Sequence, residues 1–252
     1  YKTWRPSQYD EADEDNDQWW YYIDKNGKVY IPSDSNAAVG YKYSLGDATL
    51  EIKNNGNSYN ITKKKVNSKD YFFNEDGEML SQFIEVTTAS GDLQNGMYYF
   101  GGDDDGSMKT GSQSIKDDNG DTYKFYFGTK STSGYDKKGV GITGNKSNKL
   151  YYKGLLITAD DYKYQIAEIL GEKFIVNSNG SVQHGNMEYK EDGDVLIDTR
   201  ANSDKGWTKV DYDTTDSKTK NCINMSTFND YDARVNVEEI NVNKVMNFGE
   251  EK

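Results

Sequence analysis

The pattern that decides the fold of this chain is clearest at Tyr98-Tyr99-Phe100-Gly101-Gly102-Asp103-Asp104-Asp105-Gly106-Ser107-Met108, where aromatic residues precede a small polar stretch, a glycine and an apolar residue. Related copies occupy residues 20–29, 71–79 and 174–182. Repeated units of about 20–50 residues indicate stacked supersecondary modules, none of which can bury its apolar face alone. The pattern therefore predicts stacked β-hairpins, and it favours binding over catalysis.

The composition agrees with a folded β protein. The chain has 252 residues, a formal net charge of -12 and 34% hydrophobic residues, with 21 Tyr and 9 Phe. The aromatic share argues against disorder, because each ring can bury about 150–250 Å². Tight hairpin turns need positive φ angles, and 24 Gly beside only 2 Pro suit such turns.

The charge and the cysteine count exclude several function classes. Affinity for nucleic acid comes from clusters of Lys and Arg, and the only basic run here is Lys63-Lys64-Lys65, so we expect no nucleic-acid partner. Cys222 is the only cysteine, so no disulfide can form within the chain. No apolar run approaches 18 residues and the sequence begins at Tyr1 without Met, so we expect a mature piece without membrane insertion.

Three regions are expected along the chain. Residues 1–66 read as an acidic N-terminal segment followed by irregular β-hairpins, and residues 67–186 form the hairpin repeat region. Residues 187–252 read as a C-terminal β cap or as a separate small β domain, because terminal units of a stack must cover its open end. Within them, strands are expected at 195–197, 207–210 and 235–237, the last continuing in alternation to Val245.

Local turn signals give more detail. Residues 19–29 read as one hairpin around Lys25-Asn26-Gly27, and a second hairpin is expected to join residues 49–53 to residues 58–61 through an Asn-Gly turn. Over residues 162–170 helical and strand spacing compete. We favour strands, because the following segment leads straight into a repeat turn.

The repeats resemble the cell-wall-binding repeat family of Gram-positive surface proteins, which includes choline-binding and glucan-binding repeats. The shared pattern is an aromatic pair, a polar turn, Gly and then Met-x-Thr-Gly, which continues here through Met108, Thr110 and Gly111. The resemblance implies a β-hairpin solenoid on a secreted or cell-wall-associated protein, with ligand pockets between hairpins. The family places Trp after the closing Gly, where this chain has Ser112, so a choline-like cation is the minor option for the ligand.

Aromatic side chains are the candidate ligand contacts. In a strand, neighbouring side chains point to opposite faces, so one set of rings can face outward while the other forms the core. The alternative is that these rings only stack hairpin on hairpin. The candidates are Trp19, Trp20, Tyr71, Phe73, Tyr98, Phe100, Phe125, Phe127, Tyr151 and Phe174.

No motif for metal or catalytic chemistry stands out. The acidic turns at 103–105 and 117–121 could collect calcium, but neither fits the spacing of a calcium loop, so they read as solvated turns. His184 and Cys222 lie in no recognised nucleophile motif. We expect no metal, no cofactor and no enzymatic activity.

The sequence thus predicts an all-β, non-catalytic cell-surface module that binds cell-wall or extracellular polysaccharide. One alternative is a structural or adhesive spacer, which predicts no exposed aromatic cluster. The other is a glycan hydrolase, which predicts two carboxylates about 5–9 Å apart across a cleft. The oligomeric state is open.

Overall fold

The protein is all-β, as expected. The computed structural model describes residues 2–5, 19–33, 37–46, 50–54, 56–130 and 135–246. All ladders between its named strands are antiparallel. The strands are β1 (Lys2–Arg5), β2 (Trp19–Tyr22), β3 (Ala38–Leu45), β4 (Leu50–Ile52), β5 (Tyr59–Val66), β6 (Lys69–Phe73), β7 (Phe83–Thr88), β8 (Gly96–Tyr99), β9 (Gly111–Lys116), β10 (Thr122–Phe127), β11 (Gly144–Lys146), β12 (Lys149–Tyr152), β13 (Leu155–Leu156), β14 (Tyr164–Ile169), β15 (Glu172–Asn177), β16 (Val182–Gln183), β17 (Glu188–Glu191), β18 (Asp194–Asp198), β19 (Tyr212–Asp213) and β20 (Cys222–Ile223). The helical turns are η2 (Ser203–Lys205), α1 (Tyr231–Arg234) and α2 (Val242–Val245).

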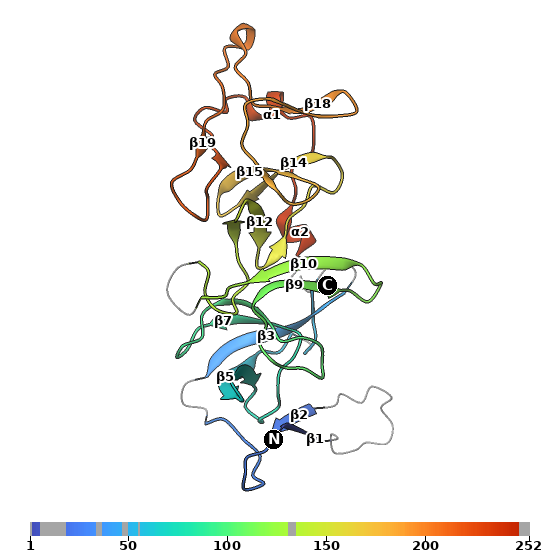
Figure 1. Cartoon of the computed structure of the whole chain (residues 1–252), viewed down its shortest axis with the longest axis vertical. Helices are drawn as coiled ribbons and strands as arrows, with labels where there is room; N and C mark the ends of the chain where they lie inside the picture. Colours follow the sequence, from blue (N-terminus) through green and yellow to red (C-terminus); the bar gives the residue numbers. More distant parts are fainter. Residues whose placement is uncertain are drawn as a thin grey trace.

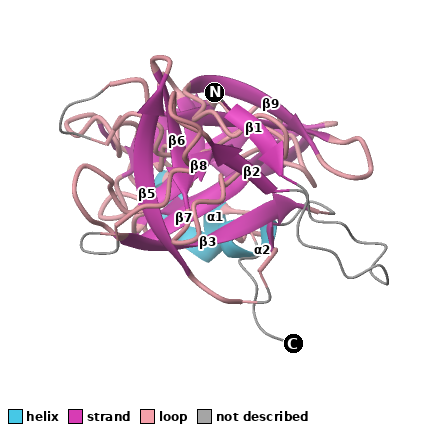
Figure 2. Ribbon diagram, turned by 90° about the horizontal axis from the view of Figure 1, so that it is seen from below, coloured by secondary structure: helices cyan, strands magenta, loops and turns pink. Residues whose placement is uncertain are grey.

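The sheets follow one another along the long axis of the molecule (Figure 1). Near the N-terminal end, β1 pairs with β2, and the next sheet has the order β6-β5-β3-β7-β8 with β4 also on β3. A five-stranded sheet of order β11-β12-β13-β10-β9 comes next, followed by β14-β15-β16 and the hairpins β17-β18 and β19-β20. Seen along that axis, the strands curve around it (Figure 2). Four apolar clusters, three of them shared by neighbouring sheets, replace a single central core.

Contacts between the repeats are regular. A Cβ on Gly106 would lie 2.2 Å from Met79 Sδ, and one on Gly139 would lie 2.5 Å from Met108 Sδ. The apolar residue after one turn glycine therefore covers the turn glycine of the next unit. The backbone repeats this relation, since Met108 N–H donates to the Asp70 carbonyl at 2.8 Å. Each unit thus fixes the position of the next one.

The polar turns share one geometry. In three of them the residue three places before the glycine is Asp or Asn, and its side-chain oxygen accepts two backbone N–H groups of the turn; these residues are Asp24, Asn74 and Asn177. The glycine N–H donates back to the carbonyl of the same residue in each case. Such side-chain-to-backbone bonds are the reason that Asn and Asp favour turns. The small polar stretch of these three repeats is therefore a structural cap, whereas Asp103 in the turn at Gly106 bonds to Ser81 and Gln82 instead.

Some local predictions are confirmed and three are wrong. The turn around Gly27 closes a hairpin through a bridge between Ile23 and Val29, and residues 162–170 form strand β14. The hairpin expected between residues 49–53 and 58–61 does not form. Its turn is present, with Asn57 N–H bonded to the Asn54 carbonyl at 3.0 Å, but both arms pair with β3 instead of with each other.

The C-terminal segment is the second wrong prediction. Instead of a long strand, it runs back over three clusters: Val235 bridges Ile197, Ile240 bridges Ala167, and Met246 joins the cluster beneath β10. Trp207 forms only one bridge, so residues 207–210 are not a strand either. The alternating apolar residues of this segment contact successive apolar clusters and do not form a β-ladder.

Two further features bear on organisation. The expected boundary between residues 66 and 67 falls at the turn between β5 and β6, inside one sheet. None of the helices in the described ranges has the length and apolar character needed to cross a membrane.

Candidate functional site

Six of the ten predicted ligand-binding rings lie in the core. Their relative exposure is 2% or less, and they are Phe73, Tyr98, Phe100, Phe125, Phe127 and Phe174. The ring centroids of Phe125 and Phe127 are 6.0 Å apart, and Phe83 lies 5.1 Å from Phe125. A ring enclosed in this way offers no face to a ligand, so for these six residues the packing alternative is the correct interpretation.

The other four candidates are half-buried and fall into two regions. Trp19, Trp20 and Tyr71 lie near the N-terminal end on β2 and β6, whereas Tyr151 lies on β12 in the five-stranded sheet. The structure therefore does not gather the predicted residues into one site. The two regions differ in whether space for a ligand remains.

Tyrosine and small polar residues share the outer face of the five-stranded sheet. The buried Phe125 and Phe127 fix the inward face of β10, so Lys124 and Tyr126 point the other way. Across the ladder, Tyr126 is paired with Ser112 and Lys124 with Ser114. We call the surface formed by Ser112, Ser114, Lys124, Tyr126, Tyr151 and Leu156 the outer sheet face.

A groove of about 370 Å³ lies at this face. One wall is the turn of the next repeat, which Lys149 anchors by donating from Nζ to the Asn179 carbonyl at 2.6 Å and to Ser181 Oγ at 2.8 Å. Its lining residues are Ser112, Gln113, Ser114, Lys124, Phe125, Lys149, Tyr151, Leu156, Asn179 and Ser181. The groove thus combines one accessible ring with hydroxyl, amide and ammonium groups.

Two tyrosine rings give the outer sheet face its apolar surface. The centroids of Tyr126 and Tyr151 are 5.9 Å apart with 51° between the ring planes. Lys146 Nζ lies 5.6 Å from the Tyr126 ring and is held by an ion pair with Asp136 at 2.7 Å. Burial raises the pKa of the Tyr151 hydroxyl, which keeps it protonated and able to donate a hydrogen bond.

Sequence reasoning selected Tyr151 but missed Tyr126 and the polar residues around it. The alternation of Thr122–Phe127 contains the signal, because the same rule that buries Phe125 and Phe127 turns Tyr126 outward. Ser112 and Ser114 follow from pairing across the β9–β10 ladder, which the sequence does not specify in register.

In the aromatic region near the N-terminal end, a lysine of the chain itself lies against the rings. Tyr22, Tyr30 and Phe73 form a chain of edge-on rings with centroids 6.5 and 5.3 Å apart. Lys64 Nζ lies 4.0 Å from the Tyr30 centroid and 5.2 Å from that of Tyr22. We call these four residues the lysine-filled cage, since an ammonium of the chain already occupies the position that a bound cation takes over aromatic rings.

Little space remains beside that cage. The adjoining apolar pocket has a volume of about 10 Å³, roughly that of one water probe. It is lined by Tyr21, Tyr22, Val66, Tyr71, Phe73 and Met79. A choline-like ligand would have to displace Lys64 and open this pocket.

The acidic turn at residues 103–105 has partners within the protein. Asp103 accepts from Ser81 Oγ at 3.0 Å and from Gln82 Nε2 at 2.8 Å, Asp104 accepts from Trp20 Nε1 at 3.3 Å, and Asp105 pairs with Lys109. Across the described ranges, no group of three or more His, Cys, Asp or Glu residues could hold a metal ion. The turn therefore ties neighbouring segments together.

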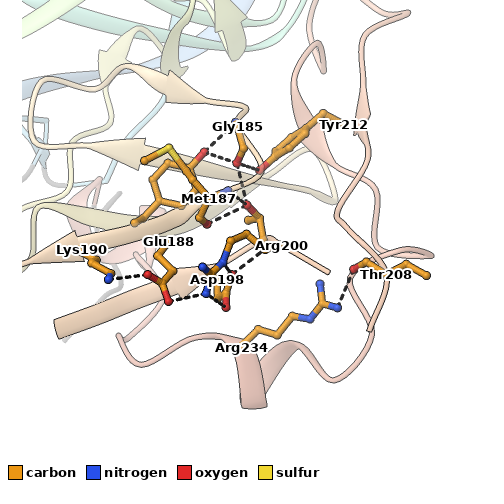
Figure 3. Close-up of polar contacts among 11 residues, drawn as sticks. Gly185, Met187, Glu188, Lys190, Asp198, Arg200, Thr208, Tyr212 and Arg234 are labelled. Carbon is orange, nitrogen blue, oxygen red and sulfur yellow. Dashed lines mark hydrogen bonds and ion pairs between the residues drawn. The ribbon is translucent and has the colours of Figure 1, made fainter. Parts of the chain in front are cut away.

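Neither Cys222 and His184 nor the close carboxylate pair Glu188 and Asp198 has the surroundings of a catalytic group. Cys222 is buried, and burial raises the pKa of its thiol to about 11, whereas His184 is exposed. Figure 3 shows the carboxylates of Glu188 and Asp198 both bonded to Arg200. Lys190 lowers the pKa of Glu188; for Asp198 burial acts in the opposite direction, but hydrogen bonds from Arg200 still lower its pKa. A general acid for glycoside cleavage needs the opposite shift.

Comparisons with known proteins find only a weak similarity in fold. Neither the protein-family models nor the curated proteins contain a match. Among solved structures, the chain is similar to choline-binding protein F from Streptococcus pneumoniae, with 18% identity, coverage of 78% of this chain and 45% of that chain, and a TM-score of 0.40. A structure of the same protein in the presence of a peptidoglycan analogue gives 18% identity, 78% and 55% coverage and a TM-score of 0.34. CbpJ from Streptococcus pneumoniae gives 15% identity, coverage of 73% of this chain and 62% of that chain, and a TM-score of 0.26.

The chain spans about half the length of the first two of these solved chains. They belong to the class of proteins that the repeat pattern resembles, but TM-scores this low do not establish a common fold.

Proposed function

We propose that this chain is a non-catalytic module that binds polysaccharide of the cell wall or extracellular matrix on its outer sheet face. The observation that carries the proposal is the groove of about 370 Å³, where the half-buried Tyr151 lies among serine, asparagine and lysine side chains. Binding sites for small ligands commonly combine apolar surface with a few placed polar groups. The proposal places the protein outside the cell, secreted or attached to the wall.

The chemistry of a sugar ring fits this groove. A pyranose has a face of C–H groups and an edge of hydroxyls, so it stacks on an aromatic ring while its hydroxyls exchange hydrogen bonds. Tyr151 supplies the ring surface in the groove, with Tyr126 beside it on the same sheet face, and Ser112, Ser114 and Asn179 supply exposed polar groups along the rim. The protonated hydroxyl of Tyr151 adds a donor.

Stacked hairpins suit a polymer rather than a single sugar. The contacts of Met79 with Gly106 and of Met108 with Gly139 support a β-hairpin solenoid across the repeat region, with the C-terminal hairpins as its cap. The groove lies between successive units, because its walls include both β9–β10 and the turn at Asn179. An extended chain can cross such a junction.

The two alternatives predict other surfaces. A passive spacer predicts no accessible aromatic cluster, whereas Tyr126 and Tyr151 are half-buried and adjacent. A hydrolase needs a carboxyl group held protonated, and the one close carboxylate pair described above, Glu188 and Asp198, has lowered pKa values instead. Binding without catalysis is the function that we favour.

A glycan array with the purified chain tests the proposal. We expect retention of a defined set of oligosaccharides, with no shortening of those oligosaccharides in the supernatant. Release of shorter sugars would assign hydrolysis instead. No retention of any glycan, including isolated wall polysaccharide, would leave the spacer as the function.

A further inference from the structure

A second groove lies apart from the outer sheet face, and it is basic. Its volume is about 650 Å³, and lysines from β5 and from the loop before β11 line it together with residues of the loop between β7 and β8. The lysines are Lys63, Lys65, Lys137 and Lys138. This concentration is notable in a chain whose formal net charge is -12, because it reverses the sign of the charge locally.

The partners inside this basic groove only partly neutralise it. Lys63 pairs with Asp92, and Lys138 pairs with the buried Asp70 at 2.7 Å. Lys137 Nζ donates to the neutral Gln94 Oε1 at 2.9 Å. The Lys65 side chain is exposed, and its ammonium has no hydrogen bond or ion pair with another residue in the described part of the chain. Four lysines and two aspartates leave a formal charge of +2.

The neutral wall of the basic groove is preorganised. Leu93 is buried at 4% exposure, Met108 is half-buried, and both line the groove. The Tyr98 hydroxyl bonds to the backbone N–H and carbonyl of Gln94, both at 3.1 Å, which fixes the loop that carries Asp92 and Gln94. A ligand here would meet cations on one side and an apolar surface on the other.

We propose that the basic groove binds a phosphate ester carried on a sugar-sized body. A phosphate monoester carries about -1.5 to -2 at neutral pH, which matches the charge left by the four lysines and two aspartates, whereas a carboxylate supplies only half of it. The volume exceeds what one phosphate needs, so the body of the ligand lies against Leu93 and Met108. The groove shares no lining residue with the outer sheet face, so the inference does not depend on the proposed polysaccharide site.

Calorimetric titration with glucose 6-phosphate, glucose and glucuronate tests the inference. We expect glucose 6-phosphate to bind, glucuronate to bind more weakly and glucose not to bind, with affinity falling as the salt concentration rises from about 20 mM to about 500 mM. The double variant Lys65→Gln/Lys137→Gln should weaken glucose 6-phosphate binding by about tenfold or more, because hydrogen bonds to charged groups are lost.

The control is Lys116→Gln/Lys209→Gln, which removes the same charge from two exposed positions outside the groove. It should keep the wild-type affinity. Lys65→Gln alone, at an exposed side chain without a partner, serves if the double variant unfolds, with thermal unfolding as the check on folding. Equal binding of glucose or glucuronate, an unchanged affinity in the groove variants, or an equal loss in the control overturns the proposal. If the array retains no glycan while glucose 6-phosphate still binds, the polysaccharide proposal fails and the basic groove remains.

Discussion

Between β2 and β6, the rings of Tyr22 and Tyr30 lie against the ammonium of Lys64, whereas on the outer sheet face Tyr151 borders an open groove of about 370 Å³ and Tyr126 packs beside it. Both regions use half-buried tyrosines at the junction of successive hairpins. They differ in what lies beside the rings: an internal cation in one, and unfilled space with hydroxyl and amide groups in the other. Ring density alone therefore does not mark a binding site.

The largest expected effect concerns the stacking that supports both regions. Gly106→Ala should lower the free energy of unfolding by about 2–4 kcal/mol, since the new Cβ meets Met79 and the φ of +64° disfavours any side chain. Gly27→Ala is the matched control, because its φ is +79° and nothing lies within 4 Å of the added Cβ. There we expect a loss of about 1 kcal/mol.

Denaturant unfolding measures both variants. Equal losses at Gly106 and Gly27 would show that the contact between Met79 and the next turn does not stabilise the stack. The two aromatic regions would then not depend on a shared stacking contact.

The next effect concerns Tyr151 on the outer sheet face. Tyr151→Ala should weaken binding of the best oligosaccharide by about tenfold, or about 1.4 kcal/mol, because it removes the ring on which the sugar stacks. Tyr71→Ala removes an equally half-buried tyrosine beside the lysine-filled cage and should leave the affinity unchanged. Isothermal titration of the three proteins gives the answer. A loss confined to Tyr71→Ala would move the site to the N-terminal region.

A smaller effect is expected on the filled side. Lys64→Ala removes the ammonium from Tyr22 and Tyr30, and the variant should bind choline weakly, with a Kd in the range of about 1 mM. Wild type should show no such binding. Lys163→Ala is the control, because that lysine lies 5.6 Å from the single ring of Tyr164 and closes no cage. If wild type bound choline as strongly as Lys64→Ala does, Lys64 would not be occupying the position of a bound cation.

The smallest effect is a pH dependence at the acidic turn that links to Trp20. Burial opposes the shift, but hydrogen bonds from Lys109 and Ser107 lower the pKa of Asp105 to about 2 from 3.8. Because the folded-state pKa is the lower one, the stabilisation is present above pH 4 and is lost as the pH falls towards 2. The Asp105 side chain is 41% exposed, so solvent screening keeps the contribution below about 1 kcal/mol.

Thermal unfolding between pH 2 and pH 5 checks this shift. Asp105→Asn should lose less stability over that window than wild type, whereas Asp118→Asn, at an exposed aspartate in another turn, should behave like wild type. Parallel curves for Asp105→Asn and wild type would show that Asp105 contributes no stability over this pH range.

The sequence predicts the parts of the structure that depend on local chemistry. Glycine turns, aromatic strands and the strand pair after Tyr162 follow from spacing and φ requirements, and they are found. Pairing is less predictable, because β4 and β5 flank a turn yet both join β3. Ladder partners depend on contacts that are distant in sequence, and so does the path of the segment from Val235 to Met246.

The candidate site shows the same division. Alternation separates Phe125 from Tyr126, so the inward and outward rings of β10 could be predicted in principle. The neighbours of Tyr151 come from β9, β10 and the turn at Asn179, and no sequence spacing brings these together. The filling of the cage by Lys64 likewise depends on register between β5 and β6, which pairs Lys64 with Tyr71.

Hydrogen–deuterium exchange with and without the best-retained oligosaccharide locates the binding surface on the protein. We predict protection of β9, β10, β12 and the turn at Asn179, with no change over β2 and β6. Protection confined to residues 19–30 and 71–79, or no protection anywhere under saturating ligand, would contradict the outer sheet face as the binding surface.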